Sequence, residues 1–419
     1  MKKYIILHFL CLLTIAMTSC KKYAEAPLLS HPAYLRVFND MAYSVDFLHN
    51  GQGVPFLTFI MDPHTDAAGV ADTGAIVGDF LGTRQLFSLS YPINEANSSS
   101  GQTTNDGRGG VVNLNPVNFE YPGNAHVLTA PAINGFDLSA WAQVPAGKHR
   151  ILFVNRPQNN TSFPNLSATI RSNVLLDTTV NFEEGEVYTM EVVARDLDNN
   201  KYGLYLRREA FVHQSFEENK IYAGFVNLSG VQPRSSQYHF KPAFSDNVSI
   251  YYTYNIYDDI ASDFKPLDPS YNPLPGYNNI YYTTLQTKMD TVIPYLALPM
   301  LPRNYFFRQD TLRTYLDKSV VLIGGGATRY GSMPHVRFDL ADAANVGPTF
   351  PLICAGDPTI FNNYNVNTTY IKKFTPNLNL VVNTGNALHI YSTLNIMEMV
   401  YDRVYLMQIQ RGFNEVPKN

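Results

Sequence analysis

The stretch Val187-Tyr-Thr-Met-Glu-Val-Val193, followed by Asp196-Leu-Asp-Asn-Asn200 and Lys201-Tyr-Gly-Leu-Tyr-Leu-Arg207, indicates the fold of this protein. Its two outer segments are rich in β-branched and aromatic residues, which favour β-strands. The Asp- and Asn-rich segment between them favours a tight turn. The sequence therefore predicts a β-hairpin over residues 187–207.

Short apolar runs of the same kind recur from residue 32 onward, separated by turn-forming residues. Clear examples are Ala33-Tyr-Leu-Arg-Val-Phe38 and His149-Arg-Ile-Leu-Phe-Val154. Helical periodicity is scarce, with short candidates only at 309–316 and 394–401. This pattern predicts an all-β fold.

The composition excludes several classes of protein. Of 419 residues only 16% are charged, against about 25% in an average soluble domain. The 31 basic and 35 acidic residues leave a net charge of −4, so the chain lacks the basic character that nucleic-acid binding requires. Low charge and high aromatic content also exclude a disordered chain or a coiled coil.

The first twenty residues, MKKYIILHFLCLLTIAMTSC, have the pattern of an export signal. Lys2 and Lys3 precede an apolar segment over 4–17 that is too short for a permanent anchor in a layer about 30 Å thick. The small residues before Cys20 resemble a bacterial lipoprotein signal, which implies cleavage before Cys20 and lipid attachment to it. An ordinary signal peptide with a chance cysteine is the alternative.

Removal of the signal changes the charge and the cysteine count. Without Lys2 and Lys3, 29 basic residues face 35 acidic ones, a net charge of −6. Cys11 is lost and Cys20 carries lipid, so Cys354 has no intramolecular disulfide partner. We interpret Cys354, which lies in an apolar run, as a buried small side chain.

Two short echoes indicate that the rest of the chain is duplicated. Tyr34-Leu-Arg-Val-Phe-Asn39 is similar to Tyr222-Ala-Gly-Phe-Val-Asn227, and Val187-Tyr-Thr-Met-Glu-Val192 is similar to Val404-Tyr-Leu-Met-Gln-Ile409. Chance similarity between strands is the alternative. The predicted organisation is a signal peptide (1–19), a lipidated tether (20–31), a first β-sandwich with a long loop insertion (32–211), a linker (212–220) and a second β-sandwich (221–419).

Four segments of the first half, in order, resemble a known family. They are Tyr34–Asn39, Ser44-Val-Asp-Phe-Leu-His-Asn-Gly51, Val144-Pro-Ala-Gly-Lys-His149 and Glu186-Val-Tyr-Thr-Met190. Together they resemble the family catalogued as domain of unknown function 4397, found in exported and lipid-anchored bacterial proteins. The second half matches only at its first and last strands. The resemblance implies two tandem immunoglobulin-like β-sandwiches and provides no catalytic residues.

No segment has a recognisable catalytic, cofactor or metal motif. Asp62-Pro-His64-Thr-Asp66, with Asp72, is the densest group of histidine and carboxylates. Such a loop can bind Ca²⁺, but Asp and Pro are also common in turns, and we favour the turn. We therefore predict no enzyme activity, no metal and no cofactor. A hydrolase with an unrecognised site is a less favoured alternative.

Tyrosine is concentrated in one region of the second half. Planar rings with a hydroxyl tip suit a sugar face or another protein, but one row of a strand can equally fill the core. On a strand, Tyr252 and Tyr254 share one face and Tyr251 and Tyr257 the other. The candidate ligand or partner surface consists of Tyr251, Tyr252, Tyr254, Tyr257, Tyr271, Tyr277, Tyr281 and Tyr282.

Three Asp-Thr triplets resemble the O-glycosylation motif of exported proteins of the Bacteroidota. They mark Thr178, Thr291 and Thr311 as candidate modification sites.

These features predict a lipid-anchored protein of the outer membrane, on its cell-surface or periplasmic face. The predicted role is non-catalytic binding or scaffolding, as an accessory to an envelope complex or to glycan uptake. Its partners are the membrane, through the anchor, and an envelope protein or a glycan, with no nucleic acid. A structural adhesin or surface-layer component is the alternative.

Overall fold

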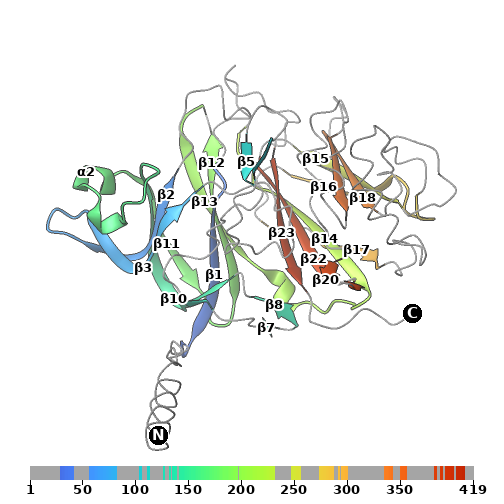
Figure 1. Ribbon diagram of the computed structural model, residues 1–419, viewed down its shortest axis with the longest axis horizontal. Helices are drawn as coiled ribbons and strands as arrows, with labels where there is room; N and C mark the ends of the chain where they lie inside the picture. Colours follow the sequence, from blue (N-terminus) through green and yellow to red (C-terminus); the bar gives the residue numbers. More distant parts are fainter. Residues whose placement is uncertain are drawn as a thin grey trace, which may run out of the picture.

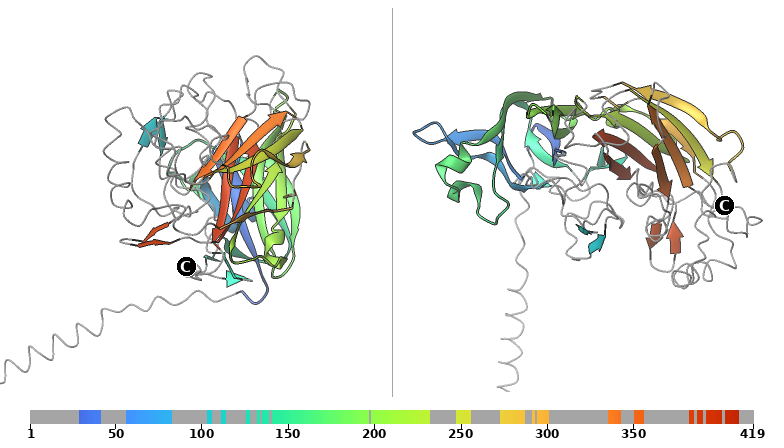
Figure 2. Two further views of the ribbon diagram at one scale, coloured as in Figure 1. Left: turned by 90° about the vertical axis from the view of Figure 1, so that its right-hand side faces the viewer. Right: turned by 90° about the horizontal axis from the view of Figure 1, so that it is seen from above.

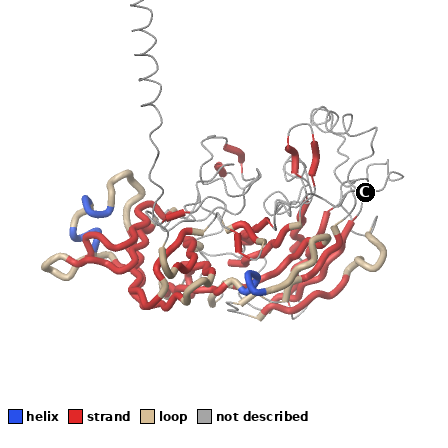
Figure 3. The backbone as a smooth tube through the Cα atoms, turned by 90° about the horizontal axis from the view of Figure 1, so that it is seen from below, coloured by secondary structure: helices blue, strands red, loops and turns tan. Residues whose placement is uncertain are grey.

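The computed structural model consists mainly of β-strands, as Figure 3 shows. Its few described helices are short: η1 (Phe163–Asn165), α2 (Ala168–Arg171) and η2 (Ala210–His213). This confirms the predicted all-β fold. The structure describes residues 29–41, 56–82, 103–105, 111–113, 126–127, 132–133, 135–138, 141–196, 198–231, 247–255, 273–286, 291–292, 294–300, 335–342, 350–355, 382–384, 387–389, 392–400 and 403–410.

The predicted hairpin over 187–207 is confirmed. Strands β12 (Val187–Asp196) and β13 (Lys201–Arg208) pair antiparallel, with Tyr188 opposite Arg208 and Asp196 opposite Lys201. Asn200 has a φ of 52°, a left-handed conformation that Asn tolerates better than most residues. The Asp- and Asn-rich segment therefore forms the turn between β12 and β13, as its sequence predicts.

The first half of the chain forms two sheets that pack as a sandwich. Sheet 1 has the order β11-β10-β2-β3, and sheet 2 has the order β13-β12-β1-β9-β6. Leu35 and Met190 of sheet 2 pack with Phe59 and Phe153 of sheet 1 in one buried cluster. The remaining strands of the two sheets are β1 (Pro32–Asn39), β2 (Leu57–Thr65), β3 (Ala71–Leu81), β6 (His126–Val127), β9 (Ala142–Pro145), β10 (Gly147–Asn155) and β11 (Val174–Phe182).

The second half forms two further sheets, of which sheet 3 has the order β17-β14-β22-β23 and sheet 4 the order β16-β15-β18-β19. Phe225 of sheet 3 meets Phe338 of sheet 4 edge to face, with ring centroids 5.0 Å apart. The strands are β14 (Lys220–Asn227), β15 (Val248–Asn255), β16 (Ile280–Leu285), β17 (Leu296–Pro299), β18 (His335–Asp342), β19 (Phe350–Ala355), β22 (Thr393–Val400) and β23 (Arg403–Gln410).

Six short strands pair in three separate ribbons. β4 (Thr103–Asn105) pairs with β5 (Val111–Asn113), β7 (Ala132–Ile133) with β8 (Phe136–Asp137), and β20 (Val382–Thr384) with β21 (Ala387–His389). Phe136 of β8 is buried in the core between the two halves.

The strand order of the first half recurs in the second. In sheet 2, β1 pairs parallel with β12, and in sheet 3, β14 pairs parallel with β22. The order β13-β12-β1-β9 thus corresponds to β23-β22-β14-β17, and β11-β10-β2-β3 corresponds to β19-β18-β15-β16. Figure 1 shows the two sets of sheets side by side. The halves therefore share one topology.

The register corrects one of the two sequence echoes. Tyr34 stands opposite Val187, and Tyr222 stands opposite Leu394, so β12 corresponds to β22. The segment 404–409, which resembles 187–192 in sequence, instead belongs to β23, the counterpart of β13. The second sequence echo predicted the wrong pair of equivalent strands, because the neighbouring strands β22 and β23 have similar residues.

Sheets 2 and 3 pack against each other, so the sheets are stacked in the order 1, 2, 3, 4 (Figure 2). Residues 187–194 of β12 and 393–400 of β22 are buried on both strand faces. Val212 and Phe216, inside the predicted linker, contribute to this shared core. The two sandwiches are therefore joined through a common apolar layer.

An ion cluster lies where the first half ends. Arg208, at the end of β13, donates from Nε to Glu186 Oε2 at 2.8 Å and from Nη2 to Glu186 Oε1 at 2.6 Å. His213 Nε2 in η2 lies 2.7 Å from Glu186 Oε2. Burial alone would raise the pKa of Glu186, but hydrogen bonds and charges from His213 and Arg208 outweigh burial and hold that pKa below its usual value.

We expect Glu186→Gln to cost about 1–2 kcal/mol of unfolding free energy at pH 7. Because the folded pKa lies below the unfolded value of about 4.3, Glu186 stabilises the protein above that pH. This contribution is lost as the pH falls through the folded pKa, so the two proteins should converge in strong acid. Urea unfolding at several pH values measures the difference.

Glu183→Gln is the matched control, because Glu183 pairs with the same arginine but its side chain is 59% exposed. It should cost less than about 0.5 kcal/mol. A difference between Glu186→Gln and the parent protein that is independent of pH would contradict the prediction.

Candidate functional site

Strands β15 and β16 divide the predicted tyrosine surface between two faces of sheet 4. Tyr252 and Tyr254 are 8% and 0% exposed, so their side chains belong to the interior. Tyr282 lies on the same side, 6.2 Å from the ring of Phe225 in sheet 3. Burial raises the pKa of all three hydroxyls. The prediction of one surface is corrected here: these three residues fill the sandwich.

Tyr251 and Tyr281 lie on the outer face of sheet 4. They are paired across the two strands, and their rings meet edge to face with centroids 5.5 Å apart. Tyr281 is 54% exposed, the largest exposed fraction among the large apolar and aromatic side chains that the structure describes. This pair is the exposed remainder of the predicted surface.

A row of hydroxyls continues from the aromatic pair. The Tyr281 hydroxyl lies 3.0 Å from Thr284 Oγ1, and Thr284 Oγ1 lies 3.0 Å from Ser249 Oγ. Each hydroxyl can donate one hydrogen bond and accept others. The outer face therefore presents two rings beside a connected polar row, which can bind a flat molecule that carries hydroxyl groups.

Tyr277 supports the end of β15 instead of joining this row. Its carbonyl accepts the N–H of Tyr254 at 2.9 Å, and its ring centroid lies 6.3 Å from those of both Tyr252 and Tyr254. Gly276 and Asn279 have φ angles of 84° and 49°, which turn the chain back toward β16. Half-buried Tyr277 thus packs the turn against the sandwich.

The other predicted sites have different outcomes. Thr178 is half-buried on β11, and its neighbour Asp177 accepts two hydrogen bonds from Arg150 at 3.0 and 2.7 Å. Thr291 is exposed. The remaining predicted residues, Cys20, Tyr257, Tyr271 and Thr311, lie outside the described residues.

The histidine–carboxylate loop has protein partners. Asp62 Oδ2 lies 2.7 Å from His149 Nδ1. Asp66 accepts the N–H groups of Ala68 and Val70 and lies 3.4 Å from Arg171 Nη2. The hydrogen bond from Val70 is the main cause of the lowered pKa of Asp66. Asp62 and His64 lie in strand β2, so the turn interpretation is correct only for Asp66, which begins the turn between β2 and β3.

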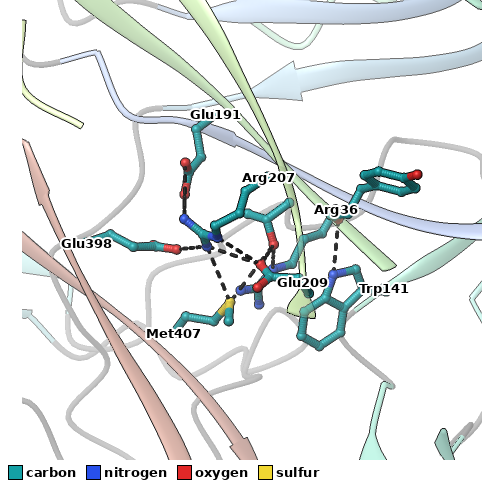
Figure 4. Close-up of polar contacts among 9 residues, drawn as sticks. Arg36, Trp141, Glu191, Arg207, Glu209, Glu398 and Met407 are labelled. Carbon is teal, nitrogen blue, oxygen red and sulfur yellow. Dashed lines mark hydrogen bonds and ion pairs between the residues drawn. The ribbon is translucent and has the colours of Figure 1, made fainter. Parts of the chain in front are cut away.

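A buried charge cluster between sheets 2 and 3 was missed at the sequence level (Figure 4). Arg207 Nη1 lies 3.3 Å from Glu191 Oε1, its Nε donates to Glu209 Oε1 at 3.2 Å, and its Nη2 pairs with Glu398 from the other half. All four side chains are 3% exposed or less. Burial alone lowers the Arg207 pKa, but the three glutamates outweigh it and raise that pKa well above its usual value.

Aromatic contacts extend the cluster within the first half. The guanidinium of Arg36 stacks over Trp141, 4.1 Å from the ring centroid, and its Nε donates to Thr189 Oγ1 at 3.2 Å. Trp141 Nε1 donates to the carbonyl of Tyr188 at 3.2 Å. These contacts hold the guanidinium of Arg36 against Trp141 and Thr189 on sheet 2.

The carboxylates of Asp40, Glu191 and Glu398 offer oxygen atoms within 4.8 Å of one another. Such a set has the ligand chemistry that hard cations prefer. Two of the three already bind the guanidinium of Arg207. We therefore interpret the cluster as the polar joint between the two halves.

In comparisons with known proteins, no family and no curated protein matches this chain. Its class is defined by the architecture: an all-β protein of stacked sheets with an aromatic outer face at one end. In Figure 1 no described helix is more than a few residues long, and none could cross a membrane.

Proposed function

We propose that this protein is a non-catalytic, lipid-anchored binding protein of the cell envelope that contacts glycan through the outer face of sheet 4. The observation that carries the proposal is the exposed Tyr281, braced by Tyr251 and continued by the hydroxyls of Thr284 and Ser249. Aromatic side chains provide large contact area at low entropic cost, because they have few rotatable bonds.

A sugar ring fits this face for chemical reasons. The apolar C–H face of a pyranose packs on an aromatic ring, and its edge hydroxyls need donors and acceptors beside that ring. The edge-to-face contact with Tyr251 limits the motion of Tyr281, so little freedom is lost on binding. A single face of this kind predicts weak binding that becomes useful on a multivalent polymer.

The anchor and the family belong to the same proposal. The export signal ending at Cys20 supports attachment to the outer membrane, and the four segments of the first half support membership of domain of unknown function 4397, with immunoglobulin-like sandwiches. Anchoring leaves the stacked sheets outside the lipid layer, where the outer face of sheet 4 can meet envelope glycans. A structural surface-layer role is the alternative.

Affinity electrophoresis of residues 21–419 in gels containing envelope polysaccharides tests the binding face. Tyr281→Ala should reduce retardation at least about tenfold in apparent affinity, because the contact ring is lost. Tyr281→Phe keeps the ring and removes only the hydroxyl, so it should lose much less.

Equal retardation of Tyr281→Ala and the parent protein would refute glycan binding at this face. A protein that binds no glycan but co-purifies with stable partners from detergent-solubilised membranes would instead support the scaffolding alternative.

A further inference from the structure

The strand registers identify equivalent positions in the two halves. Glu191 stands opposite Tyr205 in the first half, and Glu398 stands opposite Tyr405 in the second. Two residues earlier on β12 and β22, Thr189 stands opposite Arg207 and Ile396 opposite Met407. Glu191 therefore corresponds to Glu398, and Arg207 corresponds to Met407.

These equivalent residues touch each other. Arg207 Nη2 lies 3.8 Å from Met407 Sδ, and the carboxylates of Glu191 and Glu398 lie within 4.8 Å of each other. In a two-fold symmetric interface, the residues nearest the axis contact their own symmetry mates. The contact between sheets 2 and 3 thus has the geometry of a homodimer interface inside one chain.

The chemistry of this interface, in contrast, is not symmetric. The first half places polar side chains where the second has small or apolar ones: Arg36 against Gly224, Thr189 against Ile396, Arg207 against Met407, and Glu209 against Ile409. Of these charged side chains, only the glutamate is common to both halves, as Glu191 and Glu398. The single guanidinium of Arg207 binds both of these glutamates.

The aromatic residues at this interface also differ in their contacts between the two halves. Trp141 and Tyr295 occupy equivalent positions, one residue before Ala142 and Leu296. Trp141 covers the guanidinium of Arg36, whereas a Cβ at Gly224 would lie 2.8 Å from the ring of Tyr295. Because Gly224 has no side chain, the ring of Tyr295 can approach the backbone. In the second half this ring therefore occupies the volume that the side chain of Arg36 occupies in the first half.

We propose that sheets 2 and 3 are complementary recognition surfaces, so that each binds the other and neither binds a copy of itself. Two copies of sheet 2 would place Arg207 against Arg207 at the axis. Two copies of sheet 3 would bury a pair of Glu398 carboxylates with Met407 at the position where sheet 2 has Arg207. The partner that fits sheet 2 is a related sheet with a glutamate at the position of Glu398 and an apolar residue at that of Met407.

The proposal is tested in the full chain by moving the arginine from position 207 to the equivalent position 407 in the other half. Arg207→Met leaves the glutamates without their shared cation and should raise the unfolding equilibrium constant on the order of a hundredfold or more. Arg207→Met/Met407→Arg returns a guanidinium to the equivalent position, where both glutamates remain within reach. The unfolding equilibrium constant of the double variant should be at least about tenfold lower than that of Arg207→Met. The single variant Met407→Arg completes the double-mutant cycle.

Urea unfolding measures the coupling between the two positions. A double variant no more stable than Arg207→Met would overturn the inferred equivalence, as would strictly additive effects. If Arg207→Met yields no folded protein, recovery of soluble, monomeric double variant supports the proposal and continued aggregation overturns it.

Discussion

Replacing Gly230 with alanine should lower the free energy of unfolding by ~4 kcal/mol or more, an effect at the upper end for a single substitution. A Cβ at this position would lie 2.0 Å from the carbonyl oxygen of Arg195 and 2.4 Å from its carbonyl carbon. Both are backbone atoms at the end of β12, so they cannot rotate away as a side chain could.

The clash falls at a junction between the two halves of the chain. Val231 N–H donates to the Arg195 carbonyl at 2.7 Å, and Val231 forms an isolated parallel bridge with Asp196. The segment after β14 is thus pinned to the end of β12. Separating them to admit a methyl group breaks this bond and opens the core shared by sheets 2 and 3.

Gly82→Ala is the matched control, because its nearest foreign atom would be a Phe56 side-chain carbon at 3.7 Å, an ordinary contact. Thermal and urea unfolding of the two variants provide the comparison. A Gly230→Ala protein within about 1 kcal/mol of the parent would show that this close approach does not exist in solution.

Cys20→Ala should release the protein from the membrane fraction almost completely. Each buried CH₂ group of an acyl chain contributes about 0.8 kcal/mol to membrane affinity, so several chains hold a protein permanently. Without the cysteine no lipid can be attached, and the apolar segment over 4–17 is too short to hold the protein in the membrane permanently. The soluble fraction and the culture medium should then contain nearly all of the protein.

Cys354→Ala is the control for the loss of a thiol elsewhere in the chain, and it should remain membrane-bound. Fractionation with detergent phase separation, followed by mass determination of the mature N-terminus, measures both the location and the lipid. Membrane association of Cys20→Ala equal to that of the parent would refute lipid anchoring at this residue.

Local patterns predicted much of the fold because strand alternation and turn chemistry act over a few residues. The hairpin of β12 and β13 follows from its β-branched and aromatic runs and from the Asn-rich turn ending at Asn200. The first echo, between 34–39 and 222–227, matches equivalent strands β1 and β14. The second echo failed because similarity of composition does not specify which strands are neighbours.

The tyrosine region shows the limit of periodicity. Alternation indicates that Tyr252 and Tyr254 share one face and that Tyr251 lies on the other. It does not indicate which face sheet 3 covers. Packing of Phe225 against Phe338 and Tyr282 decides this, and it leaves Tyr281 exposed on the outer side.

The sequence by itself determined the all-β class, the hairpin at 187–207, and which side chains of each strand share a face. Only the tertiary structure decided that the face with Glu191 and Arg207 is buried against Glu398 of the other half. Charged residues that alternate along a strand are typical of a solvent-exposed face, because burial of a single charge is costly. That cost is offset only when a second sheet brings the opposite charge, and no local pattern encodes which sheet will do so.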